Sequence, residues 1–385
     1  MSKKDNGLAL LPNGFADSLP PNAKAEADAI RILIDQFSAF GYQRVKPPLV
    51  EFEESLLAPG PGERLASETF RMMDPVTHRM LGVRSDITAQ IARIVSSRMK
   101  GEARPLRLTY ANDVLRTRGS QMRTERQFTQ VGCELIGPAH CVQTDVEVAV
   151  LSLLGLKALE IGNITLDLTI PGFVGRVLSS VEDEALQERI LKVVAQRDSD
   201  ALLAFNMPET EILSVAMRAS GMADKAIPLL DDVSLDPALA KYWGRLKSVY
   251  DGICRALDGL GIDGVSLTLD LLEQDGFEYH KAVGFTLFSQ DLRGELGRGG
   301  CYDIRFGADK SGETAKGFTL YMDTICKDRQ VVAQENRVFV SCTESWGVIT
   351  DLQQDGWIVV RSTTEDEKPI GCSHIYENGK VIEIP

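Results

Sequence analysis

The segment FTQVGCELI, residues 128–136, is the most informative stretch of this chain. Its apolar and polar residues alternate, which predicts a β-strand, because successive side chains of a strand point to opposite faces of a sheet. One face carries a mostly apolar set that we expect to pack on a core: Thr129, Val131, Cys133 and Leu135.

The opposite face of this strand carries two polar side chains, Gln130 and Glu134, on either side of Gly132. Their Cα atoms are about 13 Å apart in an extended strand. The glycine between them leaves room for a molecule to lie against the backbone. Such a floor suits a small polar cation, for example an amino-acid ammonium group or an imidazole. The same pattern also fits a solvated face of an edge strand.

The loop before this strand, VLRTRGSQMRTER (114–126), is rich in arginine. Guanidinium groups above a pocket floor suit phosphate, so we interpret the loop as the phosphate side of the same pocket. An ordinary solvated turn is the alternative. The arginines concerned are Arg116, Arg118, Arg123 and Arg126.

Composition narrows the class of protein. Of the 385 residues, 44% are hydrophobic and 25% are charged, as in ordinary globular proteins. No apolar run is long enough for a bilayer and no signal-peptide core is present, so we expect a cytoplasmic protein without a membrane partner. The seven cysteines form no C-x-x-C pair and the four histidines are scattered, so we expect neither a metal nor a cofactor. The net charge of −13 disfavours tRNA as a partner.

The order of elements predicts an α+β fold, with a mainly antiparallel sheet flanked by helices. We place a core domain at residues 1–330 and a small C-terminal α/β domain at 331–385. Within the core, residues 175–260 have a helical, highly charged pattern and are interpreted as an insertion. We expect the glycines between Gly294 and Gly300 to form a turn that leads into a strand.

Six ordered segments resemble the catalytic core of class II aminoacyl-tRNA synthetases, and in particular that of histidyl-tRNA synthetase. The resemblance covers roughly residues 10–325. It implies the antiparallel sheet of that class, with a dimer interface at the first segment. The segments are FGYQRVKPPLVEF (40–52), MLGVRSDITAQIAR (80–93), LTYANDVLRTRGSQMRTERQFTQVGCELIG (108–137), EYHKAVGFTLF (278–288), GRGGCYDIRFG (297–307) and AKGFTLYMDTI (315–325).

The departures from the synthetase pattern predict that adenylation is lost. By resemblance Arg116 keeps the second-motif arginine, and Arg118 replaces an acidic residue. Asp275, Cys301 and Thr324 stand where the family carries arginines. Removing one donor that stabilises the transition state typically costs about 10² or more in rate. We therefore expect no catalytic residues and no aminoacylation activity.

This combination resembles the histidyl-tRNA-synthetase-like family of ATP phosphoribosyltransferase regulatory subunits. The resemblance implies a non-catalytic subunit that the short-form catalytic subunit requires for activity and for histidine feedback, in the first step of histidine biosynthesis. It further implies a homodimer within a hetero-octamer, with L-histidine as the effector. The alternatives are an active histidyl-tRNA synthetase-like amino-acid ligase and a tRNA-binding adaptor.

The resemblance also assigns a histidine-binding site. Asp86, Thr88 and Gln130 would meet the α-ammonium group and Glu134 would meet the imidazole, while Arg116 remains on the nucleotide side. Tyr279 and His280 would complete the amino-acid pocket. Purely structural roles are the alternatives. Asp86 fits a helix N-cap, His280 fits a packing residue, and Tyr279 and Tyr302 fit core aromatics.

Overall fold

The computed structural model divides the chain into two compact units, Met1–Arg329 and Gln330–Pro385. It describes residues 10–58, 62–119, 123–273, 280–304, 306, 312–327, 336–365 and 367–384. No helix within these ranges is long and apolar enough to cross a membrane. The same ranges contain no group of three His, Cys, Asp or Glu side chains that could hold a metal ion.

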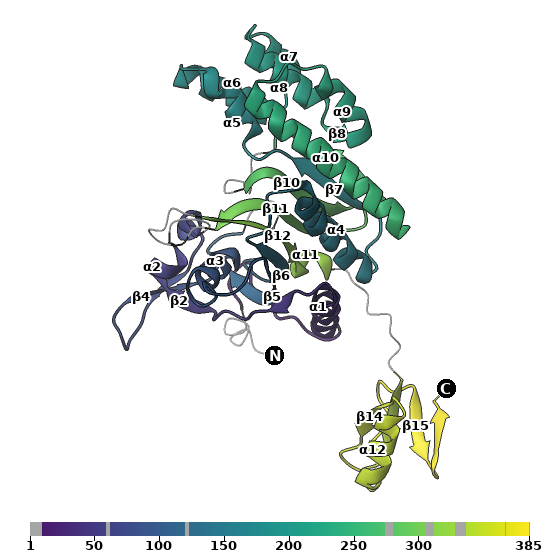
Figure 1. Cartoon of the computed structure of the whole chain (residues 1–385). Helices are drawn as coiled ribbons and strands as arrows, with labels where there is room; N and C mark the ends of the chain where they lie inside the picture. The colour runs from purple at the N-terminus through teal and green to yellow at the C-terminus, as the bar shows by residue number, and fades with distance from the viewer. Residues whose placement is uncertain are drawn as a thin grey trace. The chain divides into compact units, whose positions relative to one another are not determined.

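A mainly antiparallel sheet forms the centre of the first unit, which confirms the predicted fold class (Figure 1). The pairs β1–β5 and β7–β9 are parallel, and the remaining pairs are antiparallel. In order across the sheet, the nine strands in the described part of the chain are β1 (Gln43–Arg44), β5 (Leu106–Leu115), β6 (Gln127–Ile136), β12 (Glu313–Tyr321), β11 (Gly297–Ile304), β10 (His280–Ser289), β7 (Ile164–Thr169), β9 (Val265–Leu269) and β8 (Gly221–Met222).

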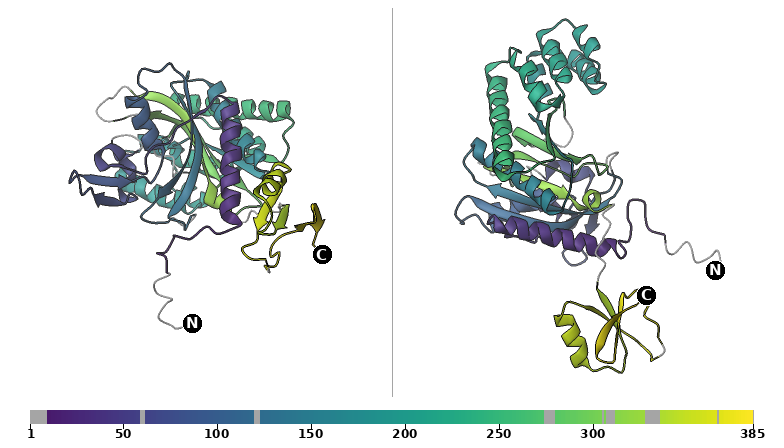
Figure 2. Two further views of the ribbon diagram at one scale, coloured as in Figure 1. Left: turned by 90° about the horizontal axis from the view of Figure 1, so that it is seen from below. Right: turned by 90° about the vertical axis from the view of Figure 1, so that its right-hand side faces the viewer.

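Three long helices cover one face of this sheet: α1 (Asn22–Ala39), α4 (Val142–Ala158) and α10 (Pro237–Leu260) (Figure 2). Their apolar sides share a single core with the strands, and the ring of Phe37 meets that of Phe318 edge-on at 5.4 Å. Local signals set the bounds of α10. The Asp236 side chain accepts hydrogen bonds from the first amides of the helix, and Gly261, with φ of +61°, ends it.

The opposite face of the sheet carries a second, more aromatic core. Helix α3 (Thr88–Ser97) packs Ile91 there, against rings that include Tyr110 and Phe128. A three-stranded sheet and a short helix complete this region: β2 (Val50–Phe52), β4 (Met80–Val83), β3 (Arg71–Met73) and α2 (Glu53–Leu56). Helix α11 (Met322–Ile325) instead buries Met322 and Ile325 in the helix-covered core. The two faces of the main sheet therefore serve different purposes, and the predicted site residues lie on the aromatic one.

The segment between β7 and β9 is almost entirely helical. It buries apolar side chains such as Ile190 and Leu213 in the same core as α4. Its helices are α5 (Phe173–Val177), α6 (Glu184–Ala195), α7 (Ser199–Leu203), α8 (Pro208–Arg218), α9 (Ala223–Asp231) and α10.

The predicted glycine-rich turn is only partly present: Gly294, with φ of +113°, lies in the loop between β10 and β11, whereas the glycines from Gly297 onward lie in strand β11. The glycines are needed for close packing within the sheet. A Cβ atom at Gly299 would lie 2.5 Å from the Phe285 ring, and one at Gly297 would lie 2.4 Å from the carbonyl oxygen of Thr319. Glycine here allows close approach rather than chain reversal.

The C-terminal unit is a small α/β structure with its own core. Val338 and Val340 pack against Ile349 and Leu352 of its helix. Strands β13 and β14 are parallel, as expected for strands joined through a helix. In its described part the unit contains β13 (Arg337–Val340), α12 (Trp346–Gln354), β14 (Ile358–Arg361), β15 (His374–Glu377) and β16 (Lys380–Glu383).

Candidate functional site

Strand β6 lies in the interior of the sheet, paired with β5 on one side and β12 on the other. The edge-strand alternative is therefore wrong. The predicted alternation is confirmed, since Val131, Cys133 and Leu135 join the helix-covered core. Gln130 and Glu134 lie on the other face, with 0% and 2% of their surface exposed. These buried polar groups need partners from neighbouring elements.

Glu134 receives its partner from β11. The hydroxyl group of Tyr302 donates to Oε2 of Glu134 at 2.8 Å. The Glu134 carboxyl extends across β12 at Gly317, where a Cβ atom would lie only 1.9 Å from Oε2. Burial, opposed by the Tyr302 hydrogen bond and reinforced by the negative charge of Asp86, raises the pKa of Glu134 to about 8. The site thus holds a neutral acid near pH 7.

Gly132 does not leave room for a ligand, which corrects the sequence interpretation. The ring of Tyr110 on β5 fills the space above it, and a Cβ atom at Gly132 would lie 2.5 Å from the Tyr110 hydroxyl. That hydroxyl and the Thr319 hydroxyl on β12 are 2.8 Å apart. An aromatic side chain from the neighbouring strand therefore separates the Gln130 and Glu134 ends of the floor.

Asp86, Thr88 and Gln130 come together as predicted. Nε2 of Gln130 donates to Oδ2 of Asp86 at 2.9 Å, and the Ile87 amide donates to Oε1 of Gln130 at 3.1 Å. The other carboxylate oxygen of Asp86 accepts from the Thr88 amide at 2.8 Å. The Asp86 carboxylate therefore contacts both the start of α3 and strand β6, although the N-cap position of the helix is Ile87 and not Asp86. It is partly exposed, whereas Thr88 and Gln130 are buried.

Two further residues were predicted for the amino-acid pocket, Tyr279 and His280. Tyr279 lies outside the described residues. His280 begins β10, and its backbone pairs with that of Tyr302. Tyr302, for which the sequence left a core aromatic as the alternative, lies in the aromatic core and also donates the hydrogen bond to Glu134. The sequence signal for a role of Tyr302 in the site was its position after three glycines of β11, since a glycine-rich strand packs closely against its neighbours.

The nucleotide side contains an arginine that is paired within the chain. The guanidinium of Arg123 lies 4.5 Å from the ring centre of Phe128 and 3.8 Å from that of Tyr321. Its Nη1 donates to Oδ1 of Asp323 at 3.0 Å, and each of these two side chains is only 9% exposed. The solvated-turn alternative is wrong for Arg123, whose charge is stacked on rings and neutralised by Asp323.

The other three arginines of the loop differ in their surroundings. Arg116, the retained second-motif arginine, lies 3.4 Å from a carboxylate oxygen of Glu68. Arg126 donates to the backbone carbonyl of Arg116 at 3.1 Å and to that of Asn13 at 3.2 Å. Arg118 is exposed. Arg116 is thus the one of these three that adjoins the site, and it already faces a carboxylate.

Two of the substituted positions lie in described strands and helices. Thr324 is buried in α11 and follows Asp323, the partner of Arg123. Cys301 lies on the helix-covered face of β11, because it is the neighbour of Tyr302 along the strand and pairs with Lys316. An arginine at 301 would therefore point away from the pocket, which corrects the inference that Cys301 marks a lost phosphate contact. Asp275 lies outside the described residues.

The comparisons with known proteins agree with this geometry. A family model described as histidyl-tRNA synthetase matches residues 14–325. A relative named ATP phosphoribosyltransferase regulatory subunit, from Rhodospirillum centenum, is 40% identical over 98% of this chain and 97% of its own length.

Solved structures show the same fold. A regulatory subunit/histidyl-tRNA synthetase from Bacillus halodurans matches with a TM-score of 0.77 and 21% identity, over 96% of each chain. A chain of an ATP phosphoribosyl transferase complex from Thermotoga maritima matches with a TM-score of 0.57 and 16% identity, over 77% of this chain and 97% of that chain.

The match to the curated relative extends over almost the whole chain at an identity far above chance. Of the residues that the resemblance singles out, Gln130 pairs with Asp86, Glu134 accepts from Tyr302, and Arg123 of the preceding loop pairs with Asp323. The chain therefore belongs to the ATP phosphoribosyltransferase regulatory subunits, within the histidyl-tRNA synthetase family.

Proposed function

We propose that this chain binds the short-form catalytic subunit of ATP phosphoribosyltransferase, activates it, and makes it sensitive to histidine without catalysing a reaction of its own. The names of the relatives support the regulatory role. The catalytic subunit is then the partner, and L-histidine is the effector. Homodimers of the chain would assemble with the partner into a hetero-octamer, which the mass of the complex in solution would test.

The ion pair between Arg123 and Asp323 carries the non-catalytic part of this proposal. Class II chemistry needs guanidinium groups that meet the phosphates as charge develops in the transition state. Arg123 is instead held by a buried carboxylate and two rings. Releasing it would leave Asp323 buried without its partner, which costs about 3–5 kcal/mol. This cost opposes nucleotide binding at that position.

The amino-acid side supplies groups of the right kind for histidine. Asp86 is the partly exposed member, and an incoming ammonium group would replace the Gln130 amide as the partner of its carboxylate. The hydroxyl of Thr88 and the carbonyl oxygen of Gln130 add acceptors. Glu134, held by Tyr302, would accept a hydrogen bond from the imidazole. A dipolar amino acid with a ring nitrogen donor fits this set.

Reconstitution tests the proposal. The chain is mixed with a short-form catalytic subunit, and formation of the phosphoribosyl product is followed with and without histidine. We expect activity that depends on this chain and that falls when histidine is added. A parallel assay of histidine-dependent ATP–pyrophosphate exchange should give no signal above a blank. Activity and histidine inhibition that are the same without this chain would refute the regulatory role.

A further inference from the structure

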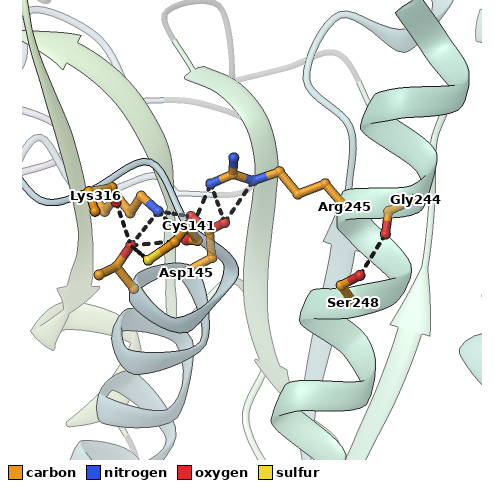
Figure 3. Close-up of polar contacts among 8 residues, drawn as sticks. Cys141, Asp145, Gly244, Arg245, Ser248 and Lys316 are labelled. Carbon is orange, nitrogen blue, oxygen red and sulfur yellow. Dashed lines mark hydrogen bonds and ion pairs between the residues drawn. The ribbon is translucent and has the colours of Figure 1, made fainter. Parts of the chain in front are cut away.

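A cluster of buried charges lies on the helix-covered face of the sheet, opposite the pocket. Nζ of Lys316 on β12 is 2.6 Å from one carboxylate oxygen of Asp145 on α4. Arg245 of α10 donates to the other oxygen through Nε at 2.8 Å and Nη2 at 2.5 Å. Figure 3 shows Lys316 and Arg245 reaching Asp145 from opposite sides. We call these three residues the ionic cluster.

The ionic cluster is more than surface charge pairing. The side chains of Lys316, Asp145 and Arg245 are 1%, 6% and 14% exposed. Two cations share one carboxylate, and the carbonyl oxygen of Cys141 accepts from Lys316 at 2.8 Å and from Arg245 at 3.4 Å. Buried pairs of this kind gain little net stability over apolar packing, so their value lies in fixing one arrangement of elements.

The cluster and the pocket share the same two strands. On β12, Lys316 is next to Gly317, which pairs with Glu134 of β6. On β11, Cys301 pairs with Lys316, and its neighbour Tyr302 donates to Glu134. Because adjacent residues of a strand point to opposite faces, a movement of β11 or β12 at the pocket also moves the cluster.

The sheet is irregular beside the cluster. The pairing of β10 with β11 shifts in register between Lys281 and Gly284. Within this bulge Ala282 has a φ of +66°, which is strained for a residue with a Cβ atom. A small pocket lies beside the cluster, between the strands and helices α4 and α10. It is lined by Asp145, Val148, Ala149, Val249, Val283, Phe285, Gly300 and Lys316.

We propose that the ionic cluster couples the state of the Glu134 pocket to helix α10 of the helical insertion. A change in the hydrogen bond between Tyr302 and Glu134 shifts β11 and β12, and Lys316 carries the shift through Asp145 to Arg245. The proposal deepens the proposed function, since it names the path by which bound histidine reaches a distant element. It requires two arrangements of the strands, which the bulge and the adjacent pocket allow.

The test changes residues on the pocket face of the sheet and measures the effect on the helix-covered face. It uses the full chain without any ligand. Hydrogen–deuterium exchange is measured for peptides that cover residues 140–150 and 237–260. Glu134→Ala and Tyr302→Phe each remove the hydrogen bond from a different partner, so that one variant that fails to fold does not end the experiment. The background is either wild type or Arg245→Met, which leaves the balanced pair of Lys316 and Asp145 in place.

In the wild-type background we expect either pocket variant to change exchange in the α10 peptide by at least about threefold. In the Arg245→Met background the same change should be absent. The matched control is Arg197→Gln, because Arg197 also pairs a cation of the insertion with a carboxylate, that of Asp270. It should leave the response intact.

Unchanged α10 exchange in both pocket variants would overturn the proposal, and so would an equal response with and without Arg245. Adding histidine to the wild-type chain distinguishes a failure of the coupling from a failure of the proposed function. If the pocket variants move α10 and histidine does not, the coupling stands and histidine is not the ligand of this pocket.

Discussion

Tyr302 on β11 donates its phenolic hydrogen to Glu134 on β6 across the intervening strand β12. Only a glycine at position 317 allows this reach, because any side chain there would occupy the position of the carboxyl group. The carboxyl group is thereby held in one orientation on this face of the sheet.

Removing the Tyr302 hydroxyl should weaken histidine binding. A hydrogen bond between two neutral groups contributes about 0.5–1.5 kcal/mol, which corresponds to an affinity loss of roughly 2- to 13-fold. Calorimetric titration of Tyr302→Phe with histidine measures this directly. Tyr376→Phe, in the separate C-terminal unit, is the control and should bind as wild type does. If both variants bind histidine with equal affinity, histidine does not bind in this pocket.

The buried Glu134 should make stability depend on pH. Its pKa is raised from 4.5 to about 8 in the folded chain, so the native state holds a proton that the unfolded state has lost between these values. Stability therefore falls as the pH rises through this range, by at most about 1.4 kcal/mol per pH unit, and levels off above it. Urea unfolding of the wild type and of Glu134→Gln at pH 6, 7 and 8 should show a steeper decline for the wild type. Parallel slopes would contradict a neutral buried acid.

Gly317→Ala should displace the Glu134 carboxyl, because the new methyl group would lie 1.9 Å from Oε2 in the present geometry. Overpacking of this kind costs about 1–3 kcal/mol. We expect a lower unfolding temperature and at least a tenfold loss of histidine affinity. Gly244→Ala is the matched control, since nothing lies within 4 Å of a Cβ atom at that helical position. It should stabilise the chain slightly, in line with the helix propensity of alanine.

Arg123→Gln should destabilise the chain by about 3–5 kcal/mol, because Asp323 would remain buried without its cation. The double variant with Asp323→Asn should recover a large part of this loss. Urea unfolding of the two single variants and the double variant gives the coupling free energy. Additive losses would mean that the two side chains do not stabilise each other.

Periodicity predicted the strand correctly because the two-residue repeat is a property of the extended backbone. Val131 and Cys133 on one face, with Gln130 and Glu134 on the other, follow from it without knowledge of neighbours. The space above Gly132 could not be predicted in the same way. It depends on which residue of β5 lies opposite, and the register places Tyr110 there.

Long-range contacts explain the other differences. The sequence places Arg123 either beside a phosphate or in a solvated turn, but its partner Asp323 comes from 200 residues further along the chain. The glycines at 297 and 299 look like a turn, and only their packing against Phe285 and β12 shows why a strand needs them. Cys301 was aligned with an arginine of the synthetases, yet the alignment alone did not say which face of β11 it occupies.

Because Arg123 is stacked and ion-paired, the proposed role has reversible ligand binding as a consequence. A synthetase consumes ATP to convert its amino acid into an adenylate, so each binding event commits the ligand to a product. A pocket that cannot activate its ligand releases it unchanged. The occupied fraction of the pocket then rises and falls with the free concentration of the amino acid, as reversible sensing requires.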